Sequence, residues 1–272
     1  MSKLKEQVSV MKQLQKIAKI FKASKGKIRP HFILTGSSGS GKSFAVEALS
    51  DMEDLGFLEV NAAQLTKEGT AGNSLSKALS GINTKAGRPT IVFVDEFDKL
   101  FISGNNNSEL AHETTNGVQN EFLKVLESKS TAVYGDYGKY VDVDISNVLF
   151  VFAGAFNGAQ ELNIDKLRDF GIKVEFLGRV GLVFNMPKLS LDSMREALET
   201  SPVLEDYLKV FKDTNKQKVV SDLMPHVEAN YEKNTLGIRM IVTLLHQYFI
   251  NDGKIPQKEV DNSTFQTLTM EA

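Results

Sequence analysis

The chain alternates short apolar runs with longer polar stretches in which apolar residues recur every three or four positions. Five of the apolar runs lack polar alternation, which is typical of strands buried on both faces of a parallel sheet. These runs cover residues 31–35, 57–61, 91–95, 148–153 and 181–186. The pattern predicts an α/β fold with a five-stranded parallel sheet flanked by helices.

A helical pattern precedes the first apolar run. Val10, Leu14, Ile17 and Phe21 recur at helical spacing with lysines between them, which predicts a basic amphipathic helix. We interpret it as a helix that packs its apolar face on the core and leaves its lysines in solvent. Contact with nucleic acid or with an acidic partner is the alternative interpretation.

After Pro187 no further buried strand is expected, and the apolar positions follow helical periods. The predicted helices cover residues 189–212, 216–233 and 236–251. We therefore expect four parts in the chain. They are a basic leader helix (1–29), an α/β domain (30–187), a small helical domain (188–251) and a tail (252–272).

Composition and charge exclude several classes of function. The 272 residues are 42% hydrophobic and 24% charged, which is ordinary for a globular protein. The sequence has no cysteine, so disulfides, thiol catalysis and sulfur-ligated zinc are excluded, and its four histidines lack metal-ligand spacing. The apolar runs are shorter than the roughly 20 residues that a membrane helix needs, and we expect a cytoplasmic protein.

The charge is unevenly distributed. Residues 1–29 contain nine Lys or Arg and one Glu, a net charge of +8, while the whole chain carries −2. The remainder therefore carries −10. This asymmetry is the observation that keeps a nucleic-acid partner open for the leader helix.

A phosphate-binding loop follows the first predicted strand and opens a helix. Its residues fit the pattern G-x-x-x-x-G-K-[ST] and are Gly36, Ser37, Ser38, Gly39, Ser40, Gly41, Lys42 and Ser43. Backbone N–H groups of such a loop converge on phosphate oxygens, and the helix dipole adds positive potential. We expect Lys42 to neutralise phosphate charge and the Ser43 hydroxyl to hold Mg²⁺, which predicts ATP with Mg²⁺ as the ligand.

The strand at 91–95 ends in two adjacent carboxylates, Asp95 and Glu96. In the context of the phosphate loop, Asp95 is predicted to belong to the metal site and to orient the waters of the Mg²⁺ ion. Glu96 is the candidate general base that polarises the attacking water. Asp98 and Lys99, one turn further on, are interpreted as structural.

Residues 36–43 and 95–100 together resemble the AAA+ ATPases, and within them the ClpX/HslU unfoldase branch. The likeness covers about residues 30–250. It is carried further by residues 117–119, 122–127, 148–156, 170–179 and 236–239.

The resemblance implies further site residues. Arg179 corresponds to the arginine finger that reaches the γ-phosphate of a neighbouring subunit, and Arg239 to the sensor-2 arginine at the start of a lid helix. A finger acting on a neighbour requires an oligomer. The resemblance implies that this oligomer is a homo-oligomeric ring, a hexamer, and that it remodels or unfolds a protein. Asn157 is the candidate for the polar sensor-1 residue of the branch.

The chain departs from the branch in its pore loop and in its peptidase loop. The branch carries an aromatic residue between glycines in the pore loop, whereas residues 69–72 place Thr70 there. The span from Asn157 to Asp169 leaves no room for the long loop that docks a peptidase, and no Ile-Gly-Phe occurs. We therefore expect a remodelling ATPase without a docked peptidase.

Half of the six tyrosines, Tyr134, Tyr137 and Tyr140, lie within seven residues. We interpret them as cross-strand aromatics of a β-hairpin. Contact with a polypeptide or nucleic-acid strand is the alternative. At the level of function, two other hypotheses stay open beside protein remodelling: a DNA-linked loader or replication ATPase, and an ATP-gated assembly factor.

Overall fold

The computed structural model describes residues 5–66, 73–85, 87–101, 109–135, 138–234 and 236–255. The Thr70 loop, Tyr137 and most of the tail lie outside these residues. The chain divides into two compact units. Within the described residues, the first contains 7–36 and 42–186, and the second contains 5–6, 37–41 and 187–255.

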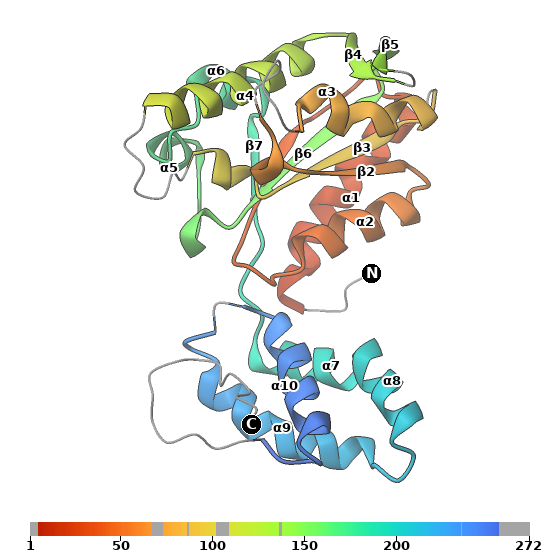
Figure 1. The fold of residues 1–272 in the computed structure, drawn as a ribbon, viewed down its shortest axis with the longest axis vertical. Helices are drawn as coiled ribbons and strands as arrows, with labels where there is room; N and C mark the ends of the chain where they lie inside the picture. The colour runs from red at the N-terminus through yellow and green to blue at the C-terminus, as the bar shows by residue number, and fades with distance from the viewer. Residues whose placement is uncertain are drawn as a thin grey trace. The chain divides into compact units, whose positions relative to one another are not determined.

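The first unit is built on a parallel sheet of five strands in the order β2-β3-β6-β1-β7 (Figure 1). The strands are β1 (Phe32–Thr35), β2 (Gly56–Asn61), β3 (Thr90–Asp95), β6 (Val148–Gly154) and β7 (Leu182–Asn185). Each of the five predicted runs is confirmed as a strand, with ends that differ by at most one residue. Every pairing in this sheet is parallel.

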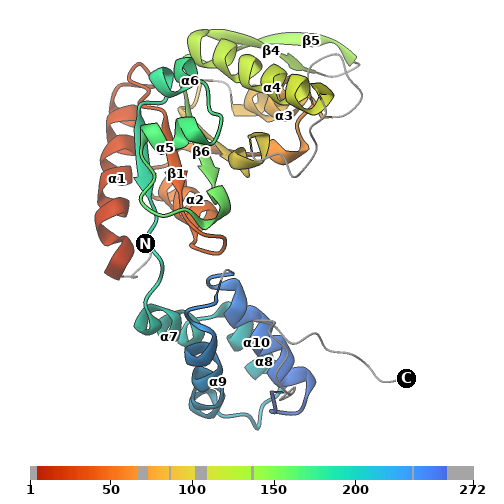
Figure 2. The ribbon, with the colours of Figure 1, turned by 90° about the vertical axis from the view of Figure 1, so that its left-hand side faces the viewer.

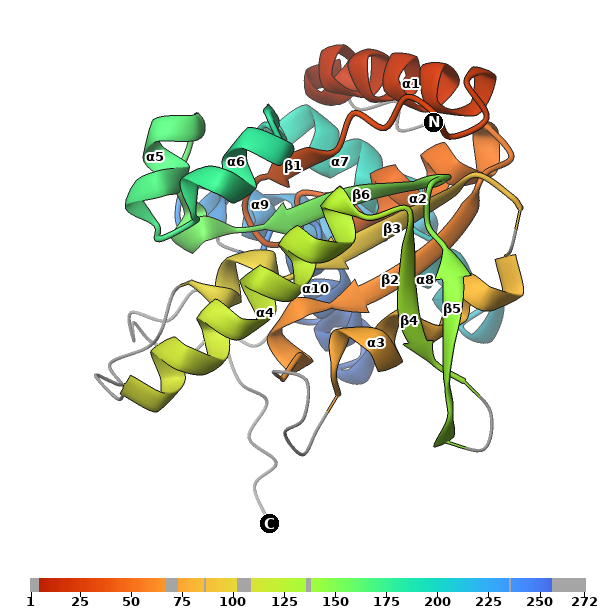
Figure 3. The same cartoon turned by 90° about the horizontal axis from the view of Figure 1, so that it is seen from above.

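Helices cover both faces of the sheet, with α1 and α2 on one face and α3 and α4 on the other (Figure 3). The helices of this unit are α1 (Val8–Ala23), α2 (Lys42–Met52), α3 (Leu75–Ala78), α4 (Glu109–Glu127), α5 (Ile164–Asp169) and α6 (Val174–Arg179). Short 3₁₀ turns are η2 (Ala62–Gln64), η3 (Leu79–Lys85), η4 (Phe97–Leu100) and η6 (Phe156–Gly158). The α/β fold predicted from the apolar pattern is confirmed.

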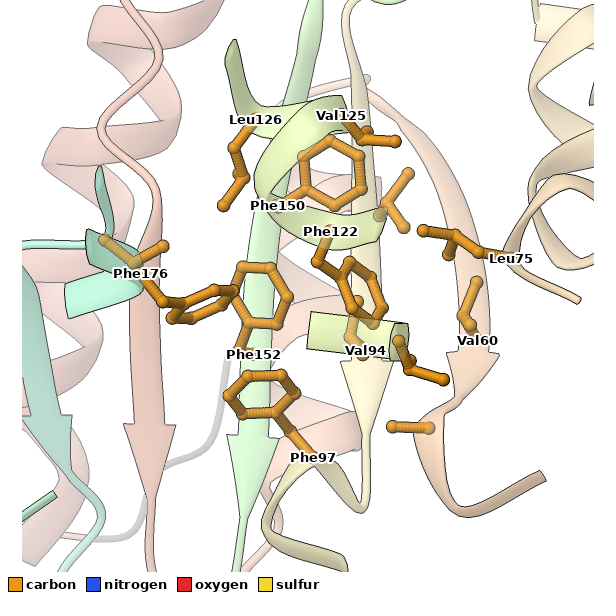
Figure 4. Close-up of a cluster of buried hydrophobic side chains, with 14 of the residues drawn as sticks. Val60, Leu75, Val94, Phe97, Phe122, Val125, Leu126, Phe150, Phe152 and Phe176 are labelled. Carbon is orange, nitrogen blue, oxygen red and sulfur yellow. The ribbon is translucent and has the colours of Figure 1, made fainter. Parts of the chain in front are cut away.

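The central strand β6 shows why these runs lack polar alternation. All seven of its residues are buried. Phe150 and Phe152 face α4 and α6, where Phe97, Phe122 and Phe176 complete an aromatic cluster (Figure 4). The alternate residues of the strand, 149, 151 and 153, pack on the opposite side with α1 and α2.

Helix α1 buries its apolar face against α2 and the side of the sheet opposite to α4. Of the four predicted residues, Leu14, Ile17 and Phe21 are at most 9% exposed and pack with side chains of α2 and the sheet. Val10 is only partly buried, and its neighbour Met11 is buried in its place. The packed-helix interpretation of the basic segment is therefore confirmed. Its lysines lie on the opposite, solvent-facing side.

The segment rich in tyrosine forms an antiparallel hairpin of β4 (Ser130–Tyr134) and β5 (Tyr140–Asp144). Tyr134 and Tyr140 face each other across the strands with ring centroids 5.7 Å apart in an edge-on arrangement. The prediction of cross-strand aromatics is confirmed for these two residues. Both rings are substantially exposed, so the hairpin also presents them to solvent.

The second unit is helical and contains α7 (Leu191–Glu199), α8 (Pro202–Val210), α9 (Lys216–Asn230) and α10 (Arg239–Ile250). The prediction of one continuous helix over 189–212 is wrong. Ser201 caps a new helix by accepting a hydrogen bond from the Leu204 N–H, and Pro202 occupies its first turn. Serine followed by proline is a signal for a helix start, and it divides the predicted segment. In the part of the chain that the structure describes, no helix has the length and apolarity to cross a membrane.

His31 is a packing residue, as the lack of metal-ligand spacing indicates. Its Nδ1 accepts a hydrogen bond of 3.0 Å from the Phe150 N–H. This bond lies next to the first residue pair of β1 and β6, Phe32 and Val151. Burial, aided by the positive charge of Arg29, lowers the pKa of His31 from 6.5 to about 4. The folded protein therefore keeps this imidazole neutral well below the pH at which the unfolded chain protonates it.

This histidine predicts a pH dependence of stability. Between pH 6.5 and 4 the unfolded chain binds a proton that the folded chain does not, so the stabilisation is complete above pH 6.5 and is lost as the pH falls. We expect the free energy of unfolding to fall by ~3 kcal/mol as the pH falls from 6.5 to 4, because His31 is protonated in the unfolded chain only. Urea unfolding followed by circular dichroism at a series of pH values measures it. A His31→Asn variant keeps an acceptor without the titration and should flatten the slope, whereas His226→Gln should not. Equal slopes for wild type and His31→Asn would contradict the assignment.

Candidate active site

The predicted phosphate loop connects β1 to α2, so the strand and the helix expected around it are confirmed. Gly39 and Gly41 have φ angles of +69° and +85°, in the left-handed region. Residues with a Cβ adopt this conformation only at an energetic cost, which explains why glycine occupies both positions. An added Cβ at Gly41 would meet nothing within 4 Å, so open space lies beside the loop at this point.

Lys42 is the first residue of α2, and its side chain turns back into the loop. The Nζ atom donates a hydrogen bond of 2.7 Å to the carbonyl oxygen of Gly36, and the residue is 9% exposed. This bond fixes the ammonium group beside the carbonyl of Gly36, directly after the end of β1. A compact cation held there suits the recognition of phosphate oxygens.

Ser43 and Asp95 are brought together from α2 and the end of β3. The Ser43 hydroxyl donates to Asp95 Oδ2 at 3.4 Å, a long contact for a direct hydrogen bond. A hydroxyl and a carboxylate are ligands that Mg²⁺ accepts when waters and phosphate oxygens complete its shell. Among the described residues no group of three or more His, Asp or Glu could hold a metal by protein ligands alone. The donor set therefore fits an ion that arrives with a nucleotide.

Glu96 lies in an unusual backbone conformation immediately after β3. Its φ and ψ are +54° and +30°, and its N–H donates to Asp95 Oδ1 at 2.8 Å. A glutamate in the left-handed region costs on the order of 1 kcal/mol or more. The Glu96 side chain is exposed at the edge of the sheet where the phosphate loop begins.

Negative charge gathers around the end of β3. Partial burial, followed by the charges of Asp95 and Glu47, raises the pKa of the Glu59 carboxyl above its ordinary value. Glu59 lies on β2, and Glu47 lies one turn after Ser43 on α2. A bound cation would offset this repulsion, so the local field agrees with a metal position beside Asp95.

Asp98, which the sequence analysis interprets as structural, is a buried carboxylate that connects the segment after β3 to the segment after β6. Asp98 is 1% exposed, and its Oδ2 accepts a hydrogen bond of 3.1 Å from the Phe156 N–H and pairs with Lys99 at 3.5 Å. A Cβ added at Gly154 would come within 2.8 Å of the other oxygen of Asp98. The structural interpretation of Asp98 is confirmed. The contact also gives a physical reason for the Gly-Ala-Phe sequence after β6.

A second polar link lies behind the phosphate loop. The Thr35 hydroxyl, one residue before Gly36, donates to Asn185 Oδ1 at 2.8 Å. The same oxygen accepts the Leu162 N–H at 2.7 Å, and Asn185 Nδ2 donates to the Leu162 carbonyl. Asn185 thus joins the ends of β1 and β7 to the segment after β6. Sequence reasoning missed this residue because its only signal is a polar side chain at a strand end.

The two arginines occupy different environments. Arg179 ends α6 and forms an ion pair of 2.6 Å with Glu127, with both side chains about half exposed. Arg239 is the first residue of α10, as predicted, and within the second unit its Nη1 donates to Ser38 Oγ at 3.1 Å. Asn157, the sensor-1 candidate, is exposed with a φ of +55°.

The geometry agrees with what comparison with known proteins finds. Residues 32–176 match the model of the ATPase family associated with various cellular activities (AAA). The chain is similar to proteins named ATP-dependent Clp protease ATP-binding subunit ClpX. One from Bacteroides fragilis is 27% identical over 86% of this chain and 68% of its own length. One from Porphyromonas gingivalis is 28% identical over 79% of this chain and 64% of its own length. The chain thus spans about two thirds of the length of these relatives.

The position of Lys42 predicts the effect of removing its charge. We expect Lys42→Ala to weaken ATP binding by roughly 100-fold or more, because a charge-assisted contact inside the loop is lost. Titration with a fluorescent ATP analogue measures this effect. Lys124→Ala removes an exposed lysine of α4 and serves as the matched control. Near-normal affinity of Lys42→Ala would overturn the site assignment.

Proposed function

The chain belongs to the AAA family of ATPases and hydrolyses ATP, and from this premise we propose that it forms a homo-oligomeric ring that remodels or unfolds a protein. The observation that carries the proposal is the placement of Lys42, the Ser43–Asp95 contact and Glu96 at one edge of the sheet. The similar proteins are named as the ATP-binding subunit of a protease, and this supports a protein as the partner.

In this proposal the loop and Lys42 bind the phosphates, and Ser43 and Asp95 would hold Mg²⁺. When bound, the ion would supply positive charge that neutralises the phosphate oxygens. The chain's own residues do the rest of the positioning. Glycine conformations at Gly39 and Gly41 aim backbone N–H groups, and the Gly36 carbonyl keeps the ammonium of Lys42 in place until a ligand arrives.

Glu96 is proposed as the general base. It would accept a proton from the water that attacks the γ-phosphorus, while the bond to the bridging oxygen breaks and ADP leaves. Its backbone is held in the left-handed region by the bond of its N–H to Asp95. This conformation keeps its carboxylate exposed instead of turning it into the sheet.

Arg179 is proposed as a finger that acts on the neighbouring subunit, and Arg239 as a phosphate-sensing residue of the lid. In the single chain Arg179 pairs with Glu127. An exposed pair of this kind contributes only about 0–1 kcal/mol, so the guanidinium is available at little cost for a phosphate of an adjacent subunit. A ring of six is the assembly that the family resemblance implies.

The finger role of Arg179 predicts that its removal affects ATP hydrolysis but not ATP binding. We expect Arg179→Ala to retain ATP affinity and to lose hydrolysis by roughly 1,000-fold or more. Glu127→Gln removes only the partner of the ion pair and should stay active. Mixing Arg179→Ala subunits with Glu96→Gln subunits should restore turnover, because each supplies what its neighbour lacks. If the mixture stays inactive or Arg179→Ala hydrolyses normally, the finger role is wrong.

We propose that the remodelling activity works without a docked peptidase. The segment between β6 and α6 consists of the turn η6, a short connection and α5. No long loop is inserted in this described part of the chain. The exposed hairpin offers an alternative contact surface for a polypeptide, because Tyr134 and Tyr140 present aromatic rings with large contact area.

The hairpin predicts a defect in partner binding that leaves the ATPase site intact. Glu96→Gln in ATP should hold fluorescein-labelled casein, an unstructured protein, in a stable complex. Adding Tyr134→Ala and Tyr140→Ala should weaken this binding at least ~10-fold, in line with the loss of two aromatic contacts. The matched pair Tyr134→Phe and Tyr140→Phe keeps the rings and should bind normally. Unchanged casein binding by the double alanine variant would contradict the contact.

A further inference from the structure

The solvent-facing side of α1 carries a row of positive charge that the ATPase site does not use. Its exposed lysines, with those of the turn that follows, form what we call the lysine face. They are Lys12, Lys16, Lys19, Lys22, Lys25 and Lys27. No acidic residue occurs between residues 7 and 29. Figures 2 and 3 show α1 on the outer side of the first unit, with the sheet and α2 on one side of it only.

Most of this charge is not neutralised within the described residues. Lys22 reaches Asp54 at 4.0 Å and donates to the Glu53 carbonyl. The other five lysines of the face form no ion pair with a described residue. A local excess of about five positive charges therefore remains on one helix and the turn after it.

The lysine face is held on a rigid support. The opposite side of α1 is buried, with Leu14 and Phe21 at 0% exposure. Lys12, Lys16 and Lys19 lie about 6 Å and 4.5 Å apart along the helix axis. This row is about as long as three nucleotides of a B-form strand, at 3.4 Å each.

We propose that the lysine face is a nucleic-acid-binding surface that holds the phosphate backbone without reading its sequence. Lysine is a point charge that accepts many phosphate geometries, and lysine contacts to phosphates supply sequence-independent affinity. The inference goes beyond the remodelling function and does not depend on it, since α1 contributes no residue to the ATPase site.

Two other partners fit the lysine face less well. A helix that binds a membrane surface must bury its apolar face in lipid, and the apolar face of α1 is already buried in the protein core. Only Ile20 and Ile28 are large exposed apolar residues in this segment. A protein interface is normally enriched in aromatic residues and arginine and depleted of lysine.

Fluorescence polarisation of the full chain with labelled 30-nucleotide single-stranded DNA, duplex DNA and RNA tests the proposal across a salt series. We expect binding by the wild type that weakens linearly in a plot of log K against log salt concentration. The variant Lys12→Gln/Lys16→Gln/Lys19→Gln should bind at least ~10-fold more weakly at low salt. Its salt slope should be smaller by about 2 to 3, as expected for three lost phosphate contacts.

A matched variant separates this surface from a general effect of charge. Lys212→Gln/Lys218→Gln/Lys233→Gln removes three exposed lysines from the second unit and should bind like the wild type. Basal ATPase activity should be equal in all three proteins. Equal weakening by both triple variants, or no binding by the wild type, would overturn the proposal. Binding of vesicles with anionic lipids but not of nucleic acid would overturn it in favour of a membrane surface.

Discussion

The parallel pairing of β1, β3 and β6 is the constraint on which the first unit depends. Parallel strands bring all their carboxyl ends to one edge of the sheet, and ligands of open α/β sheets bind at that edge. Thr35, Asp95 and Gly154 are the last residues of these strands. Gly36 and Glu96 follow the first two at once, and Asn157 lies three residues after Gly154. Burial of β6 on both faces fixes this pairing, because a shift of one residue would exchange the side chains that face the two helical layers.

Conformations that cost energy occur at this same edge. Glu96, Phe156 and Asn157 all have positive φ angles although none is glycine. Buried hydrogen bonds offset that cost, most clearly the bond from the Phe156 N–H to Asp98. Strain of this kind persists only where surrounding contacts over-determine it, and it is commonly found where side chains must be aimed at a ligand. The aromatic cluster of Phe97, Phe152 and Phe176, next to the ends of β3 and β6, provides those contacts.

The local pattern of the sequence was sufficient to predict the five strands of the sheet and the phosphate-binding loop. Uninterrupted apolar runs identified all five strands, and the G-x-x-x-x-G-K-[ST] spacing identified a loop whose glycines do take left-handed conformations. What the sequence did not predict depends on contacts between residues far apart in the chain. Asn185 reaches Thr35 across 150 positions, and the role of Asp98 becomes visible only when Gly154 lies against it. The break at Ser201 was missed for a different reason, since helical periodicity continued across a capping signal.

Folding explains the apolar face of helix α1 but not the uniform positive charge of its exposed face. Its apolar face is needed, because it covers β1 and β6 with Leu14 and Phe21. A solvated face needs only polar residues of either sign, and mixed charges would serve solubility without self-repulsion. Here every charged residue from 7 to 29 is positive while the rest of the chain is acidic. Packing therefore explains the position of the helix but not the sign of its charge, and a polyanionic partner accounts for that sign directly.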